Sequence, residues 1–204
     1  MFSFIAPITR YLIIANILVY GLQMVTGDWS IIYFALWPWH TSNLPNVPPF
    51  EVWQLVTYGF MHDTDNLAHI FFNMFALFMF GSDIERSMGA KKYLSYYFTC
   101  VIGAAVAQLA VMALTKSPPM PTIGASGAVF GILLAFGIAF PERRIMLLFP
   151  PIPMPARVFV TLYGVLELML GVFGSQQGVA HFAHLGGMAA GYLLILYWRH
   201  GRRR

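Results

Sequence analysis

Charged side chains are scarce in this chain of 204 residues: Asp, Glu, Lys and Arg make up 10% of it, while hydrophobic residues make up 58%. Ordinary soluble domains carry about 25% charged residues. A soluble fold of this size would need far more polar surface, so the apolar excess must face lipid or line a membrane-buried bundle. The composition therefore indicates one integral membrane domain over residues 1–204, with the lipid bilayer as its surroundings.

The chain also lacks a second cysteine, so Cys100 has no partner for an internal disulfide. Its net charge of +4 comes from basic residues in short clusters between apolar stretches, not in one stripe, which argues against a nucleic-acid partner. Arg10 precedes the first apolar run, but no small-residue cleavage pattern follows that run. We therefore expect a retained helix there and no removed signal peptide.

What the chain does contain is a series of charge-poor stretches long enough to cross a bilayer, which takes about 20 residues. They predict an all-α membrane protein built as a six-helix transmembrane bundle. The expected spans are 10–27, 66–85, 91–114, 122–140, 157–173 and 178–198. The fifth is the weakest, because Glu167 interrupts it and the Pro-rich segment 150–155 precedes it.

The orientation follows from the basic residues, since cytoplasmic loops hold them more easily than translocated loops do. With six spans, only Lys116 falls on the outer side. The cytoplasmic side then holds Arg10, Arg86, Lys91, Lys92, Arg143, Arg144, Arg157, Arg199, Arg202, Arg203 and Arg204. Segment 28–65 has no Lys or Arg but is rich in aromatic residues, which predicts an external loop lying at the membrane interface. Both termini are expected to be cytoplasmic.

Polar, potentially reactive residues inside spans are expensive in lipid and therefore suggest function. His69 and Asn73 stand four apart on the second expected span and so share one helix face. Ser126 lies in GASG near the start of the fourth span, and His184 lies in AHLGGMAAG on the sixth. These three spans run from outside to inside, which places all four side chains about 5–11 Å below the outer end.

Glycines on two of these spans explain how Ser126 and His184 could meet, because small residues let helix backbones approach closely. These glycines are Gly124, Gly127, Gly131, Gly187 and Gly191. A serine hydroxyl is a weak nucleophile, and a neighbouring imidazole activates it by taking its proton and returning it to the leaving amine. Because Glu167 stands on another span at an undefined offset, no acid is expected beside the base, and we predict a two-residue Ser126–His184 dyad.

Peptide hydrolysis also needs hydrogen-bond donors aimed at the developing oxyanion. The side chains of His69 and Asn73 project from one helix face and fit that role. The backbone N–H near Ser126, close to a helix start, supplies a third donor. The predicted oxyanion contributors are therefore His69, Asn73 and Ser126.

His181 stands three residues before His184 and is the residue most easily mistaken for the base. We assign the base to His184 because only this histidine is followed by glycines at the third and seventh positions. Together with His62 and His69, the two histidines raise a metal site as an alternative. An HExxH motif is absent and no Asp, Glu or Cys stands at ligand spacing beside them, so we expect no metal.

The motifs HIFFN at 69–73, GASG at 124–127 and AHLGGMAAG at 183–191 follow one another along the expected spans. In this order they resemble the rhomboid intramembrane serine proteases, and GSDIERSMG at 81–89 and Trp53 are also similar to that family. The chain differs in carrying Gln54 where the family often has Arg, and Phe130 where many bacterial members have Tyr. The resemblance implies hydrolysis of transmembrane protein substrates near helix-destabilising residues, without metal or cofactor, and the same roles for Ser126 and His184.

The leading hypothesis is therefore an intramembrane serine endopeptidase. A noncatalytic binder of transmembrane helices with the same fold is the alternative, and labelling of Ser126 by a serine-directed probe would distinguish the two. A transporter or channel is poorly supported, because the polar set is confined to the outer half of the spans. The lack of a transit peptide and the compact six-span form lead us to expect a bacterial inner membrane.

Overall fold

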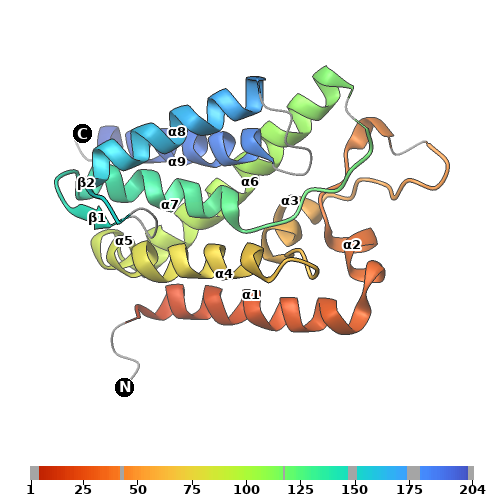
Figure 1. Cartoon of the computed structure of the whole chain (residues 1–204), viewed down its shortest axis with the longest axis horizontal. Helices are drawn as coiled ribbons and strands as arrows, with labels where there is room; N and C mark the ends of the chain where they lie inside the picture. Colours follow the sequence, from red (N-terminus) through yellow and green to blue (C-terminus); the bar gives the residue numbers. More distant parts are fainter. Residues whose placement is uncertain (1–4, 42–43, 117, 147–150, 174–179, 202–204) are drawn as a thin grey trace.

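The computed structural model describes residues 5–41, 44–116, 118–146, 151–173 and 180–201. Most of this part of the chain is helical (Figure 1). The helices are α1 (Pro7–Thr26), α2 (Asp28–Phe34), η1 (Trp39–Thr41), α3 (Gln54–Thr57), η2 (Tyr58–Phe60), α4 (Leu67–Ala76), η3 (Leu77–Gly81), α5 (Ser82–Met88), α6 (Ala90–Thr115), α7 (Ser126–Ala139), α8 (Ala156–Phe173) and α9 (His181–Gly201). Strands β1 (Arg144–Met146) and β2 (Pro153–Pro155) pair antiparallel between α7 and α8.

Four helical stretches are long and apolar enough to cross a bilayer: α1, the continuous stretch Leu67–Met88, α6 and α8. Helix α7 is apolar but shorter, with 14 residues, and α9 has 21 residues. These helices confirm the prediction of an all-α membrane bundle. The number of six spans stays a prediction, and the expected start of the last span at residue 178 lies outside the described residues.

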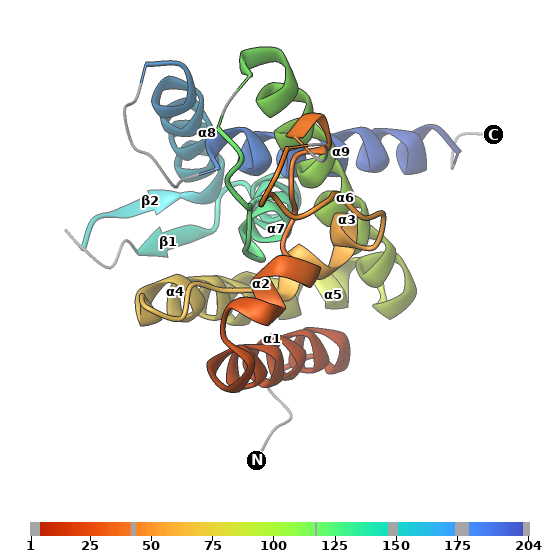
Figure 2. The same ribbon diagram turned by 90° about the vertical axis from the view of Figure 1, so that its right-hand side faces the viewer.

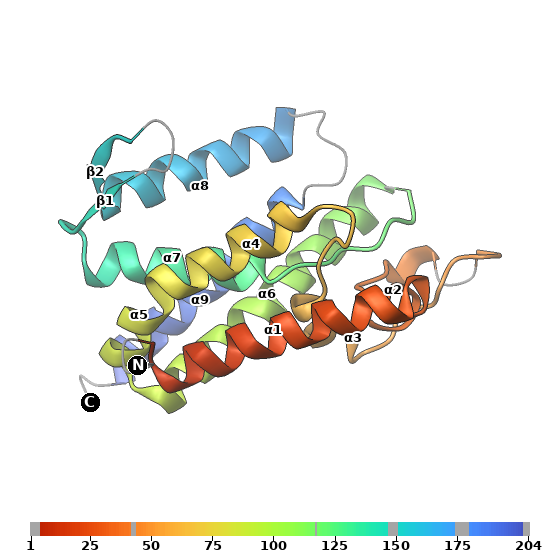
Figure 3. The same ribbon diagram turned by 60° about the horizontal axis from the view of Figure 1, so that its bottom comes forward.

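Helix α7 lies at the centre of the bundle. Figure 2 shows it surrounded by α4, α6, α8 and α9, all of which it contacts. Most of its side chains are buried, as an apolar helix without a polar face requires. Helices α1 and α8 lie on opposite sides of the bundle (Figure 3). A residue at the start of α7 is therefore held by several helices at once.

The structure differs from the expectations in one helix boundary and in the content of one loop. Helix α7 begins at Ser126, four residues later than the expected span, because Thr122 pairs with Leu36 in an isolated β-bridge and Gly124 has a φ of 126°. Neither conformation is helical. Segment 28–65, which we expected to be an external loop, contains the short helices α2, η1, α3 and η2.

The start of α1 and the ends of α5 and α9 lie at one end of the bundle (Figure 1). We call this the basic end, because the described residues Arg10, Arg86, Lys92, Arg143 and Arg199 gather there. The expected basic tail at residues 202–204 lies outside the described residues.

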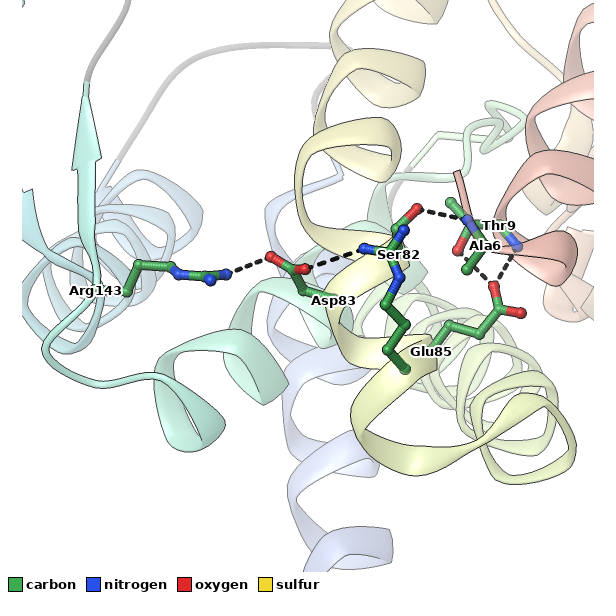
Figure 4. A network of polar contacts seen from close by, with 7 residues as sticks. Ala6, Thr9, Ser82, Asp83, Glu85 and Arg143 are labelled. Atoms are coloured by element: carbon green, nitrogen blue, oxygen red, sulfur yellow. Dashed lines mark hydrogen bonds and ion pairs between the residues drawn. The ribbon is translucent and has the colours of Figure 1, made fainter. Parts of the chain in front are cut away.

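A polar network joins α1, α5 and the turn after α7 at the basic end (Figure 4). The Glu85 carboxylate accepts hydrogen bonds from the backbone N–H groups of Ile8 at 2.9 Å and Thr9 at 2.7 Å, and from the Thr9 hydroxyl at 2.9 Å. Asp83 forms an ion pair with Arg143. Because α1 has no side-chain cap of its own, a carboxylate from α5 satisfies its first N–H groups.

Candidate active site

Ser126 is the first residue of α7 and is partly exposed. The chain reaches it through a sharp turn at Gly124, whose positive φ favours glycine. The backbone N–H of Gly124 donates to the carbonyl of Tyr58 at 3.0 Å, which ties this turn to η2. The serine thus stands at a helix N-terminus, where the first backbone N–H groups have no partners within the helix.

His184 lies on α9 and directs its Nε2 at the hydroxyl of Ser126, with 2.8 Å between Nε2 and Oγ. The two residues are 58 positions apart in the chain, so only the packing of α7 against α9 joins them. Its imidazole ring stacks on the Phe130 ring, with 4.3 Å between centroids and 5° between planes. The ring is therefore held from its face as well as at its edge.

The close approach of α7 and α9 depends on glycine. A Cβ atom added at Gly187 would lie 2.0 Å from the carbonyl oxygen of Gly127, so no other residue fits there without moving a helix. Gly131 and Gly191 also make room for α6, since their added Cβ atoms would meet Cys100 and Tyr96 of that helix. Gly124 was expected among the helix-packing glycines, but it precedes α7.

His69 lies on α4 and approaches the serine from the other side. Its Nδ1 accepts the backbone N–H of Asp63 at 3.2 Å, so in the neutral ring the proton is on Nε2. A Cβ atom added at Gly124 would lie 2.8 Å from that Nε2 and 3.6 Å from the Ser126 Oγ. The imidazole N–H of His69 and the hydroxyl of Ser126 thus both lie around the turn at Gly124.

Asn73 is buried one turn further along α4. Its side-chain Nδ2 donates to the backbone carbonyl of His69 at 2.8 Å. An amide group has two N–H donors, so this bond occupies one of them and leaves the other for a further acceptor.

Glu167 of α8 contradicts the expectation that no acid lies beside the base. Its Oε2 is 2.8 Å from Nδ1 of His184 and 2.7 Å from Nδ1 of His181, and all three residues are buried. Spacing along the chain could not reveal this, because α8 and α9 are separate helices whose relative rotation depends on their packing. A signal was nevertheless present: an acid inside an apolar span is costly without a partner, and His181 and His184 share a helix face.

The same three residues are the candidates for a metal site among the described residues, with their ligand atoms within 4.8 Å of one another. The argument that no acid stands near the histidines was therefore wrong. Hydrogen bonds nevertheless account for the distances. Ligand atoms around tetrahedral zinc, at bond lengths of about 2.0–2.2 Å, lie roughly 3.3 Å or more apart, whereas the atoms here are 2.7 and 2.8 Å apart.

A serine hydroxyl that is hydrogen-bonded to an imidazole, close to the backbone N–H donors at a helix start, is an arrangement suited to acyl transfer. Residues 49–200 match the family model of the rhomboid domain. The chain belongs to the rhomboid family. This rhomboid is 26% identical over 196 residues to the rhomboid protease GlpG of Yersinia pestis (strain Pestoides F), covering 94% of this chain and 62% of the relative. It is 27% identical over 192 residues to the mitochondrial rhomboid protein 1 of Saccharomyces cerevisiae, covering 89% of this chain and 50% of the relative.

The rhomboid chain thus spans between half and about three fifths of the length of these relatives. The family is one of intramembrane proteases, and the apolar helices make this member an integral membrane protein.

Proposed function

We propose that this rhomboid is an intramembrane serine endopeptidase that cleaves transmembrane segments of other membrane proteins. Ser126 is the nucleophile and His184 the general base. The observation that carries the proposal is the 2.8 Å separation between the Ser126 Oγ and the His184 Nε2, at the start of the central helix. The similarity to the GlpG protease of Yersinia adds support.

In the acylation step, the Ser126 oxygen forms a bond to the scissile carbonyl carbon while its proton passes to Nε2 of His184. The carbonyl π electrons move onto oxygen and create the oxyanion. Collapse of this intermediate breaks the C–N bond, and the imidazolium returns its proton to the leaving nitrogen. A water molecule then attacks the acyl carbon while its proton passes to Nε2 of His184, and the imidazolium protonates the Ser126 oxygen as the ester C–O bond breaks.

The oxyanion is stabilised by the Nε2–H of His69, the free amide N–H of Asn73 and the backbone N–H of Ser126. Support comes from the position of the His69 Nε2 beside Gly124 and from the location of Ser126 at the first turn of α7. Each such donor is typically worth about 3 kcal/mol in the transition state. No metal or cofactor enters the proposed reaction.

We also propose that six helical stretches span the bilayer, with both termini cytoplasmic, and that the membrane is a bacterial inner membrane. The gathering of basic side chains at one end of the bundle supports this orientation, while Lys116 caps the opposite end of α6. Ser126, at the far end of α7 from the basic end, then lies in the outer half of the membrane.

Cleavage of a model transmembrane substrate by the purified protein in liposomes tests the proposal. Ser126→Ala and His184→Ala are each expected to reduce cleavage to background. Ser87→Ala and His200→Ala are matched controls, because both side chains are exposed at the basic end, and they should cleave like the wild type. Full cleavage by either active-site variant would contradict the proposal, and absence of cleavage by the wild type would favour a noncatalytic binder of transmembrane helices.

A further inference from the structure

Glu167 is a buried carboxylate on a helix that is otherwise mostly exposed. The buried residues of α8 are Ala156, Val160 and Glu167, while its neighbour Leu168 is 49% exposed. An acid inside a membrane helix is costly unless it is paired, so its partners indicate why it is tolerated. Both of those partners are histidines of α9, and one of them is the proposed base.

The two contacts fix where the ring protons are. A carboxylate oxygen only accepts hydrogen bonds, so Nδ1 of His184, at 2.8 Å from the Glu167 Oε2, carries a proton. In a neutral ring Nε2 is then an acceptor, and it is this atom that lies 2.8 Å from the Ser126 hydroxyl. The carboxylate thus selects the one tautomer of His184 that can take a proton from the serine.

His181 makes the matching contact to the same oxygen at 2.7 Å. It lies one turn before His184 on α9, so the two Nδ1–H groups reach Oε2 from the same helix face. Among the described residues, Nε2 of His181 has no hydrogen-bond partner. The ring of His181 therefore hydrogen-bonds through Nδ1 to the carboxylate, and its Nε2 makes no hydrogen bond to Ser126.

We infer that Glu167 is a positioning residue of the hydrolytic site, forming a line from Ser126 through His184 to Glu167, with His181 as a second donor that holds the carboxylate in place. The inference rests on the proposed function. During attack the serine proton moves to Nε2, and the positive charge that forms on the ring lies beside the carboxylate. The Nδ1 proton stays on the ring and Glu167 stays ionised.

This role predicts a specific kinetic change in Glu167→Gln. A carboxamide can turn its NH₂ group toward Nδ1 and hold the ring in the wrong tautomer, which lowers kcat by between about 100- and 10,000-fold. KM for the transmembrane substrate should change less than threefold, because the side chain does not contact the substrate. Glu167→Asp keeps the charge, and its kcat should be at least tenfold higher than that of Glu167→Gln.

Two further variants separate positioning from mere packing. Leu168→Ala alters the adjacent, exposed position of α8 and should leave kcat within twofold of the wild type. His181→Phe removes one donor but keeps the contact between Glu167 and His184, and should lower kcat by tenfold or less. A loss in Leu168→Ala or His181→Phe equal to that in Glu167→Gln would overturn the assignment.

The tautomer of His184 can also be measured in the wild-type protein, so this test does not depend on whether a variant folds. Nitrogen-15 NMR of labelled histidine is expected to show His184 in its neutral form protonated on Nδ1, and protonated on Nε2 in Glu167→Gln. A neutral wild-type ring protonated on Nε2, or an unchanged kcat in Glu167→Gln, would overturn the inference. Either result would leave the proposed function standing if Ser126→Ala is inactive, whereas an active Ser126→Ala would refute the proposed function itself.

Discussion

Gly124 occupies a position where a methyl group has no room. Its φ of 126° is strained for any residue with a side chain, and an added Cβ would lie 2.8 Å from the His69 Nε2. We predict that Gly124→Ala shifts His69 or the turn before Ser126, and that kcat falls between about 10- and 100-fold. The kcat of the variant is measured with a transmembrane substrate in liposomes.

The matched control is Gly21→Ala in the C-terminal half of α1, where an added Cβ meets nothing within 4 Å. It should leave kcat unchanged and, if anything, stabilise the helix by about 0.5–1 kcal/mol. Equal activity of Gly124→Ala and Gly21→Ala would show that the turn at Gly124 does not position the site.

His62, in the segment between η2 and α4, is fully buried. Burial, with a smaller contribution from neighbouring His69, lowers the pKa of His62 from 6.5 to about 4. Between pH 6.5 and 4 the unfolded chain binds a proton at His62 that the folded chain does not. The free energy of unfolding is therefore highest above pH 6.5 and decreases by about 3 kcal/mol as the pH falls toward 4. His62→Gln should flatten this dependence when unfolding in detergent is followed against pH, and an unchanged slope would contradict the assignment.

At the scale of elements, the start of α1 is held by a residue of another helix. Glu85 accepts three hydrogen bonds from Ile8 and Thr9 in a buried position. Removing it leaves the buried Thr9 N–H and hydroxyl and the partly buried Ile8 N–H without acceptors, so Glu85→Ala should lower the free energy of unfolding by about 2–4 kcal/mol. Glu142→Gln breaks an exposed ion pair with Arg157 and should cost about 0.5 kcal/mol or less. Similar Tm values for the two variants would contradict the capping role.

The positions of most helices could be predicted from the sequence, because charge-poor runs of membrane length are a local property of the chain. The start of α7 could not, since it depends on a β-bridge between Thr122 and Leu36, far apart in the sequence. The contact of Glu167 with His184 was missed for a related reason. It depends on how two helices are rotated against each other, which residue spacing within either helix does not encode.

At the scale of the whole molecule, the proposed orientation predicts which ends of the bundle reagents can reach. Cys100 is buried, so single cysteines can be introduced at exposed sites with little background. In intact cells a membrane-impermeant maleimide should label Val52→Cys, in the segment proposed to be external, and should label Ser87→Cys at the basic end only after lysis. The reverse pattern would contradict the proposed orientation.

The central claim is that Ser126 is an activated nucleophile in a folded membrane bundle, and covalent labelling tests it most directly. Treatment with a fluorophosphonate, followed by peptide mass spectrometry, should give one adduct on Ser126 that is absent in Ser126→Ala and strongly slowed in His184→Ala. Absence of any adduct on the folded wild-type protein, or equal labelling of the Ser126→Ala variant, would contradict the account.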